Sequence, residues 1–313
     1  MVTRWSLLLV LAWALLFLLP SQPAAAAAEA VDTDTAAQMM KVVKDSAISG
    51  GGCTALASLK DMAVPAAAHN SFTVIGDSWG FLFYGEFKDN MIDAGYGSSF
   101  EYYMRAVPGT EASQWVSNES YCRLLFLLVK FLVRNDTGTP HVLISLGGND
   151  LVNDYDVWGV EIYDRIEADL RTLVNRLIDE NSNVVIIFSG YDIVNMYKNQ
   201  YCIDWAIDLL GSAEPSVVNP GLIELGNRQA AIAADYPNVY YANSFGALQG
   251  TPGNPNINEY SPVHYFTNYP FWQEDCIHMN FDGYDVFTQA VVDWMENNGV
   301  IPPLASSPAV IKQ

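Results

Sequence analysis

Residues 72–80 read Phe-Thr-Val-Ile-Gly-Asp-Ser-Trp-Gly, a short apolar run that ends in a tight turn. The run at residues 72–75 has the length of one strand, and a helical stretch follows the turn. A strand that is apolar throughout is typical of parallel sheets, whose strands are covered on both faces. The stretch therefore predicts the first strand–helix unit of an α/β domain.

Three further apolar runs of strand length lie at residues 142–146, 184–188 and 239–242, each bounded by Gly, Ser or Asn. Residues 100–107 differ because polar side chains are mixed with apolar ones, which predicts an edge strand. The strands alternate with helical patterns, and this alternation predicts a three-layer α/β/α sandwich around a five-stranded parallel sheet.

The helices are predicted from apolar side chains at helical spacing. One stripe comprises Ile162, Ile166, Leu170, Leu173 and Leu177, and another comprises Tyr284, Phe287, Ala290, Val291 and Trp294. The second stripe ends at Asn298-Gly299, a common helix stop. Residues 124–133 are strongly apolar but short, and they include Lys130. They predict a buried helix and not a membrane span.

Two segments interrupt the alternation, at residues 192–220 and 250–274. Both follow strands, so both are expected over the C-terminal edge of the sheet, where open α/β folds bind ligands. The second carries aromatic side chains that could cover part of a bound substrate or could pack the loop onto the sheet: Tyr260, Tyr265, Phe266, Tyr269, Phe271 and Trp272. The same two interpretations, a wall of the binding site or part of the core, apply to Trp79, Phe81, Phe83 and Tyr84.

The chain carries 15 Lys and Arg against 35 Asp and Glu, a net charge of −20. No basic cluster occurs in it, which argues against nucleic acid and anionic membranes as partners. Half of the residues are hydrophobic, enough for a substantial core.

The N-terminus has the pattern of an export signal: Arg4, an apolar run at residues 5–19 and an alanine tract. We expect residues 1–28 to be a signal peptide and the protein to be secreted or periplasmic, with no stable membrane insertion after its removal. An uncleaved anchor is the alternative. Residues 29–70 form an extension to which the sequence assigns no role, residues 71–299 form the main α/β domain and residues 300–313 form a tail.

The four histidines divide by their place relative to the strands. His69 and His141 precede strands, which places them at the N-terminal edge of the sheet. His264 and His278 follow the last strand and belong at the C-terminal edge. His278 lies three residues after Asp275, a spacing at which a carboxylate can orient one ring nitrogen while the other acts as a base.

A candidate nucleophile lies at the same edge. Ser78 sits in the strand-to-helix turn at residues 76–80, where its hydroxyl would be exposed and its amide close to a helix N-terminus. After the third strand, Gly147 and Gly148 permit close backbone approach, and the Asn149 side chain can donate to an oxyanion. After the second strand, the amide of Gly109 is a further donor.

In these blocks the sequence resembles the SGNH (GDSL-type) hydrolases. The matching blocks are Gly76-Asp-Ser78, Gly109, Gly147-x-Asn149-Asp150 and Asp275-x-x-His278-x-Asn280, followed by Gly283-Tyr284. The sequence departs from the usual pattern at Gly80, Cys276 and Met279, and none of these removes a catalytic atom.

The resemblance implies a flavodoxin-like sheet in the order 2-1-3-4-5. It implies that Ser78 attacks an acyl carbon while His278 takes the proton and Asp275 orients the ring. The oxyanion would be held by the amides of Ser78 and Gly109 and by the Asn149 side chain. The remaining matching residues would support the site or cap the final helix: Asp77, Gly148, Asp150 and Asn280.

The four cysteines, Cys53, Cys122, Cys202 and Cys276, are too widely spaced for a zinc site. The sequence indicates no metal and no cofactor. Cys276 lies beside the predicted base, and Cys202 lies in a segment that leaves from the same sheet edge, so we predict a disulfide between them. Cys122 is then the natural partner of Cys53. Four reduced, buried cysteines are the alternative.

The function predicted from the sequence is that of a secreted serine esterase acting on a small-molecule, lipid or acylated-glycan ester. An acyltransferase with the same residues and a non-catalytic binding protein on the same fold are the alternatives.

Overall fold

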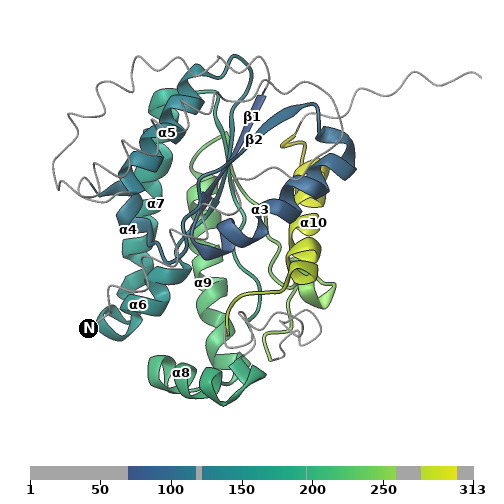
Figure 1. The fold of residues 1–313 in the computed structure, drawn as a ribbon. Helices are drawn as coiled ribbons and strands as arrows, with labels where there is room; N and C mark the ends of the chain where they lie inside the picture. The colour runs from purple at the N-terminus through teal and green to yellow at the C-terminus, as the bar shows by residue number, and fades with distance from the viewer. Residues whose placement is uncertain (1–69, 118–121, 195, 259–275, 302–313) are drawn as a thin grey trace, which may run out of the picture. The chain divides into compact units, whose positions relative to one another are not determined.

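The computed structural model describes residues 70–117, 122–194, 196–258 and 276–301, all of which belong to the unit Met62–Gln313. Figure 1 shows their arrangement. In chain order the strands and helices are β1 (Asn70–Gly76), α3 (Ser78–Met91), η2 (Ile92–Tyr96), β2 (Phe100–Met104), α4 (Ala112–Val116), α5 (Cys122–Asn135), β3 (His141–Ser145), α6 (Gly148–Trp158), α7 (Glu161–Glu180), β4 (Val185–Phe188), η3 (Met196–Lys198), α8 (Gln200–Leu210), α9 (Pro215–Ala234), β5 (Val239–Tyr241), η4 (Ala247–Gln249) and α10 (Phe281–Asn297).

The sheet has five parallel strands in the order β2-β1-β3-β4-β5, as predicted. Each predicted strand matches an observed one within a few residues at each end. β2, with its mixed polar and apolar residues, is an edge strand paired with β1. β1, β3 and β4 are almost wholly buried, which explains why their sequences are continuously apolar.

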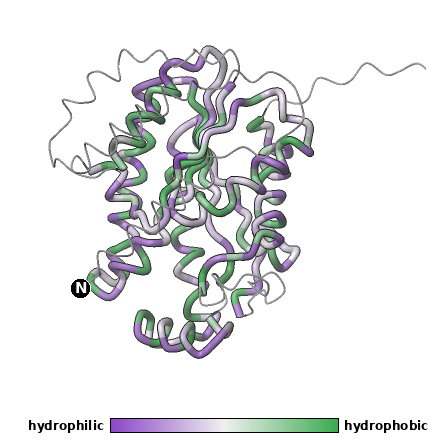
Figure 2. The backbone as a smooth tube through the Cα atoms, in the orientation of Figure 1, coloured by the Kyte–Doolittle hydropathy of each residue, from purple (hydrophilic) through white to green (hydrophobic). Residues whose placement is uncertain are grey.

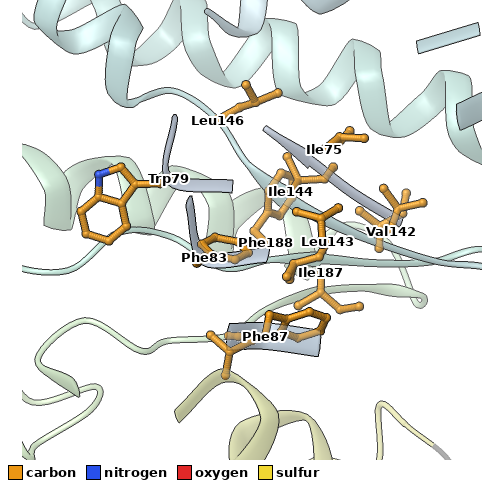
Figure 3. Close-up of a cluster of buried hydrophobic side chains, with 14 of the residues drawn as sticks. Ile75, Trp79, Phe83, Phe87, Val142, Leu143, Ile144, Leu146, Ile187 and Phe188 are labelled. Atoms are coloured by element: carbon orange, nitrogen blue, oxygen red, sulfur yellow. The ribbon is translucent and has the colours of Figure 1, made fainter. Parts of the chain in front are cut away.

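Helices cover both faces of the sheet. α3 packs against α10 on one face, while α5, α7 and α9 lie on the other (Figure 1). Hydrophobic stretches, green in Figure 2, run through the central strands and along the helices that cover them. Trp79 and Phe83 of α3 are buried in this core, with Trp79 at one end of the cluster drawn in Figure 3. Core packing therefore explains these two aromatic residues, while Phe81 and Tyr84 are partly exposed.

The predicted helical stripes are buried faces. The stripe on α7 packs into the core, and α10 ends at Asn297, shortly before Gly299 with its positive φ of 64°. α5 is the predicted short buried helix, with Phe126, Val129 and Val133 in the core. In the part of the chain that the structure describes, every helix is too short or too polar to cross a membrane.

The first segment that interrupts the alternation, at residues 192–220, is itself mostly helical. It contains η3, α8 and the first residues of α9. The Asn199 side chain caps α8 by accepting from the Cys202 backbone N–H at 2.9 Å, and Pro215 begins α9.

Because all five strands are parallel, the segments that follow them emerge at one edge of the sheet. Two of these segments are joined directly. The buried carboxylate of Asp192, after β4, accepts the backbone N–H groups of Gly246 at 2.6 Å and Leu248 at 2.9 Å, after β5. This edge carries the residues described next.

Candidate active site

Ser78 and His278 meet at the C-terminal edge of the sheet. The His278 Nε2 atom lies 2.5 Å from the Ser78 Oγ atom, although 200 residues of sequence separate them. Ser78 is the first residue of α3, and His278 lies just before α10. The packing of α3 against α10 therefore brings the two side chains together. Both are 8 % exposed.

The turn between β1 and α3 determines where Ser78 lies. A Cβ atom on Gly76 would lie 2.5 Å from the Ser145 carbonyl oxygen, so only glycine permits this approach of β1 to β3. The Asp77 backbone N–H donates to the same oxygen at 2.9 Å. The Asp77 carboxylate caps α3 by accepting from the Trp79 N–H at 2.9 Å. As a residue of the first helical turn, Ser78 has a backbone N–H without an intrahelical acceptor.

Asn149 lies at the start of α6, directly after β3. Its Nδ2 atom donates to the Thr110 carbonyl oxygen at 3.0 Å. The preceding Gly147 has a φ of 111°, a left-handed conformation that favours glycine. A side-chain amide has two N–H donors, and this hydrogen bond uses one. It fixes the plane of the amide group.

The turn after β2 carries Gly109, which is exposed and has a φ of 77°. The turn is joined to the end of β1, because the Val107 N–H donates to the Gly76 carbonyl oxygen at 2.8 Å. The Thr110 hydroxyl is buried and donates to the Val107 carbonyl oxygen at 2.9 Å. It also accepts from the Trp115 indole N–H at 3.1 Å. The segments after β1, β2 and β3 are thus linked by hydrogen bonds.

Two buried carboxyl groups lie behind these segments. Burial raises the pKa of Asp77 to about 6, although hydrogen bonds from Tyr191 and Trp79 lower it. Burial also raises the pKa of Asp150 to about 7. Both Asp150 oxygens accept from the Ala112 N–H, at 3.0 and 3.2 Å, so this carboxyl group joins α6 to the start of α4.

Two further predicted residues stabilise the segment around His278. Cys276 forms a disulfide with Cys202, the pairing that the sequence predicts, with the Cα atoms 5.3 Å apart. The Asn280 side chain caps α10 by accepting from the Gly283 N–H at 2.8 Å. Cys122 is buried at the start of α5.

Several predicted residues lie outside the described part of the chain. They are Asp275, Cys53, His69, His264, the signal peptide and the aromatic residues at positions 260–272. His141 is described and lies at the N-terminal end of β3, away from Ser78. Its ring is buried and packs against Phe72. In the described ranges, no group of three or more His, Cys, Asp or Glu side chains has the arrangement of a metal site.

Sequence reasoning missed two residues, Tyr191 and Thr110. Tyr191 follows β4, and its hydroxyl donates to the Asp77 carboxylate at 2.5 Å and accepts from the Gly148 N–H at 2.9 Å. A signal was present, because Tyr191 lies directly beyond a strand end, as Asp77 and Asn149 do. Its partners come from distant parts of the sequence, so that signal could not identify them.

No protein-family model matches the sequence, and no curated protein matches it significantly. Solved structures do match. One is a protein from Streptococcus pneumonia provisionally assigned as a platelet activating factor, 14 % identical, with a TM-score of 0.51, covering 85 % of this chain and 96 % of its own. Another is a provisionally assigned GDSL-like lipase from Parabacteroides merdae, 13 % identical, with a TM-score of 0.49, covering 74 % of this chain and 96 % of its own.

These likenesses concern the fold. The first of the two extends over most of both chains. The observed strand order, β2-β1-β3-β4-β5, is the order that the sequence resemblance implies. The chain therefore has a three-layer α/β/α fold with a parallel five-stranded sheet, which is the fold that the sequence resemblance to the SGNH-type hydrolases implies.

Proposed function

We propose that the protein is a secreted serine esterase that hydrolyses acyl esters through an acyl-enzyme intermediate. The observation that carries the proposal is the 2.5 Å contact between the Ser78 hydroxyl and the His278 imidazole. A serine hydroxyl is a weak nucleophile until a neighbouring base accepts its proton. An imidazole nitrogen within hydrogen-bond distance of the hydroxyl is the arrangement that this chemistry requires.

In the first half of the reaction, the Ser78 oxygen attacks the ester carbonyl carbon while His278 Nε2 takes the hydroxyl proton. The tetrahedral intermediate then collapses, and the alcohol leaves with the proton from His278. In the second half, His278 takes a proton from water, and the resulting hydroxide attacks the acyl-enzyme. The acid leaves and Ser78 regains its proton. Asp275 is proposed to orient the His278 ring.

The negative charge that develops on the carbonyl oxygen needs hydrogen-bond donors already in place. We assign this role to the backbone N–H groups of Ser78 and Gly109 and to the Asn149 side chain. Support comes from the helix-start position of Ser78 and from the Thr110 contact that orients the Asn149 amide. Asp77, Gly148 and Asp150 support these donors from behind.

The proposal includes export. The disulfide between Cys202 and Cys276 is typical of proteins that fold in an oxidising compartment. The substrate class is a small-molecule, lipid or acylated-glycan ester, and we expect neutral esters of short to medium acyl chain.

The test is a rate profile over nitrophenyl esters from acetate to palmitate, with Ser78→Ala measured in parallel. We expect the highest rates with the shorter chains and loss of turnover in Ser78→Ala. Equal rates for both proteins would exclude Ser78 as the nucleophile. Ester formation with added alcohol at the expense of hydrolysis would identify an acyltransferase. Rates that rise toward palmitate at an oil–water interface would identify a lipase.

A further inference from the structure

Tyr191 lies between the two loops that carry the proposed nucleophile and the proposed side-chain oxyanion donor. It follows β4 and is 5 % exposed. Its ring contacts the indole ring of Trp79, the residue after Ser78, with the ring centroids 5.2 Å apart in an edge-to-face arrangement. The side chain is therefore packed, from the side of β3 and β4, against the turn at residues 76–80 that carries Ser78, which we call the nucleophile turn.

The Tyr191 hydroxyl makes one hydrogen bond to each loop. It donates to Asp77 Oδ2 at 2.5 Å, and Asp77 is the residue before Ser78. It accepts from the Gly148 backbone N–H at 2.9 Å, and Gly148 is the residue before Asn149. A phenol can donate and accept at once, whereas a phenylalanine ring can do neither. One oxygen atom thus links the residue before Ser78 to the residue before Asn149.

The start of α6 approaches the Tyr191 ring too closely for any residue with a Cβ atom. A Cβ atom on Gly148 would lie 2.8 Å from two carbon atoms of the ring and 3.0 Å from its hydroxyl oxygen. The backbone φ at Gly148 is not positive, so available space is the reason for glycine here. Glycine at position 148 therefore lets the start of α6 lie directly against the Tyr191 ring. This contact sets the position of the next residue, Asn149, relative to the nucleophile turn.

The chemistry of the hydroxyl suits a permanent link. Burial raises the pKa of Tyr191 well above its usual value, so the phenol stays neutral and remains a donor. The titratable groups near Asp77 are Tyr191 after β4, His278 before α10 and Asp150 on α6. Of these, the Tyr191 hydroxyl is hydrogen-bonded to the Asp77 carboxylate and stabilises its charged form.

We propose that Tyr191 is a positioning residue of the site, which sets the spacing between the Ser78 hydroxyl and the Asn149 amide by bridging Asp77 and Gly148. The proposal rests on the proposed esterase function. Catalysis depends on this spacing because the oxyanion donors must fit the transition state, and a displacement of about 1 Å can cost on the order of 100-fold in rate.

The test is Tyr191→Phe, which keeps the ring contact with Trp79 and removes both hydrogen bonds. We expect kcat to fall roughly 10- to 100-fold with KM within about threefold of wild type, because binding groups are untouched. Tyr102→Phe is the matched control, since it removes one tyrosine hydrogen bond, to the Tyr96 carbonyl oxygen at 3.1 Å, far from this edge.

A double-mutant cycle separates positioning from general loosening of the fold. If Tyr191 acts through Asp77, then Asp77→Ala, which removes the acceptor of the Tyr191 hydroxyl, combined with Tyr191→Phe should lose much less than the product of the two single losses. Independent, multiplicative losses would overturn the bridge. Should Tyr191→Phe fail to fold, Gly148→Ala disturbs the same contact from the other side, and normal activity in that variant would contradict the proposal.

The outcomes also separate this proposal from the esterase assignment. Wild-type kcat in Tyr191→Phe, with Ser78→Ala inactive, would refute the positioning role and leave the esterase assignment in place. If no Ser78-dependent hydrolysis is found, the esterase assignment fails. Amide hydrogen exchange at Gly148 then still decides the bridge, because protection of this amide should be lost in Tyr191→Phe and kept in Tyr102→Phe. Unchanged protection would overturn it.

Discussion

The side-chain amide of Asn149 is held by the backbone of Thr110, with 3.0 Å between the Asn149 Nδ2 atom and the Thr110 carbonyl oxygen. Thr110 follows Gly109 directly, so this hydrogen bond couples two of the proposed oxyanion donors. A displacement of the turn after β2 would move the Asn149 side chain as well. The proposed oxyanion site is therefore expected to respond as a unit.

Replacement of Asn149 by Ala should lower kcat by roughly 10²- to 10³-fold with little change in KM, the cost of removing one oxyanion donor. Steady-state kinetics on the best nitrophenyl ester would measure this. Asn153→Ala is the matched control, because Asn153 lies on the same helix and its amide donates to Glu111 at the surface, at 2.8 Å. An Asn149 variant altered mainly in KM would assign this side chain to ground-state binding instead.

Ser78→Ala and His278→Ala should lose comparable activity, because nucleophile and base act together. The activity that remains in either variant should exceed the uncatalysed reaction in water by at most ~10³- to 10⁴-fold, which is the acceleration that binding and oxyanion contacts provide. His264→Ala is expected to stay within about tenfold of wild type. Equal damage from His264→Ala and His278→Ala would mean that the base has been assigned to the wrong histidine.

The buried carboxyl group of Asp150 should make the fold less stable as the pH rises. Its pKa is about 7 in the folded protein, against an ordinary value of 3.8. Between these values the folded protein binds the proton more tightly than the unfolded chain. The contribution to the free energy of unfolding is thus fully present below the ordinary pKa and is lost as the pH rises through 7.

Asp150→Asn keeps an oxygen acceptor for the Ala112 N–H and removes the titration. It should reduce the fall in the free energy of unfolding between about pH 5 and pH 8 by roughly 1–4 kcal/mol. Urea unfolding at both pH values measures the difference. Asp156→Asn, at an exposed position of the same helix, should leave the pH dependence as it is in wild type. An unaltered pH dependence in Asp150→Asn would show that this group is not the source.

Removal of the Cys202–Cys276 disulfide should lower both stability and activity. The bond spans 74 residues of sequence, and disulfides typically contribute about 2–4 kcal/mol. Cys276 is two residues before His278, so we expect kcat to fall in the double variant Cys202→Ser, Cys276→Ser. Thermal unfolding and ester turnover would test this. Full activity in the double variant, or after complete reduction of the wild type, would rule out a role in positioning the base.

Much of the fold was predictable because the buried strands are marked by continuous apolar runs and the helices by periodic ones. The meeting of Ser78 with His278 was predictable because both follow strands, and parallel strands end at one sheet edge. The helix α8 was not predicted. Gly211, Pro215 and Pro220 follow its last residue, Leu210, at short intervals, and such residues are typical of loops. The roles of Tyr191 and Thr110 depend on contacts between strand ends that local patterns do not encode.

The segment that carries His278 is restrained on both sides, by the disulfide at Cys276 and by the helix cap at Asn280. The first of these restraints forms only when two thiols are oxidised. In a reducing compartment, a newly synthesised chain would contain the sheet and the turn that carries Ser78, but the segment around His278 would lack its covalent restraint. For the exported esterase proposed above, catalytic competence would then arrive with oxidation, and activity would begin only after export.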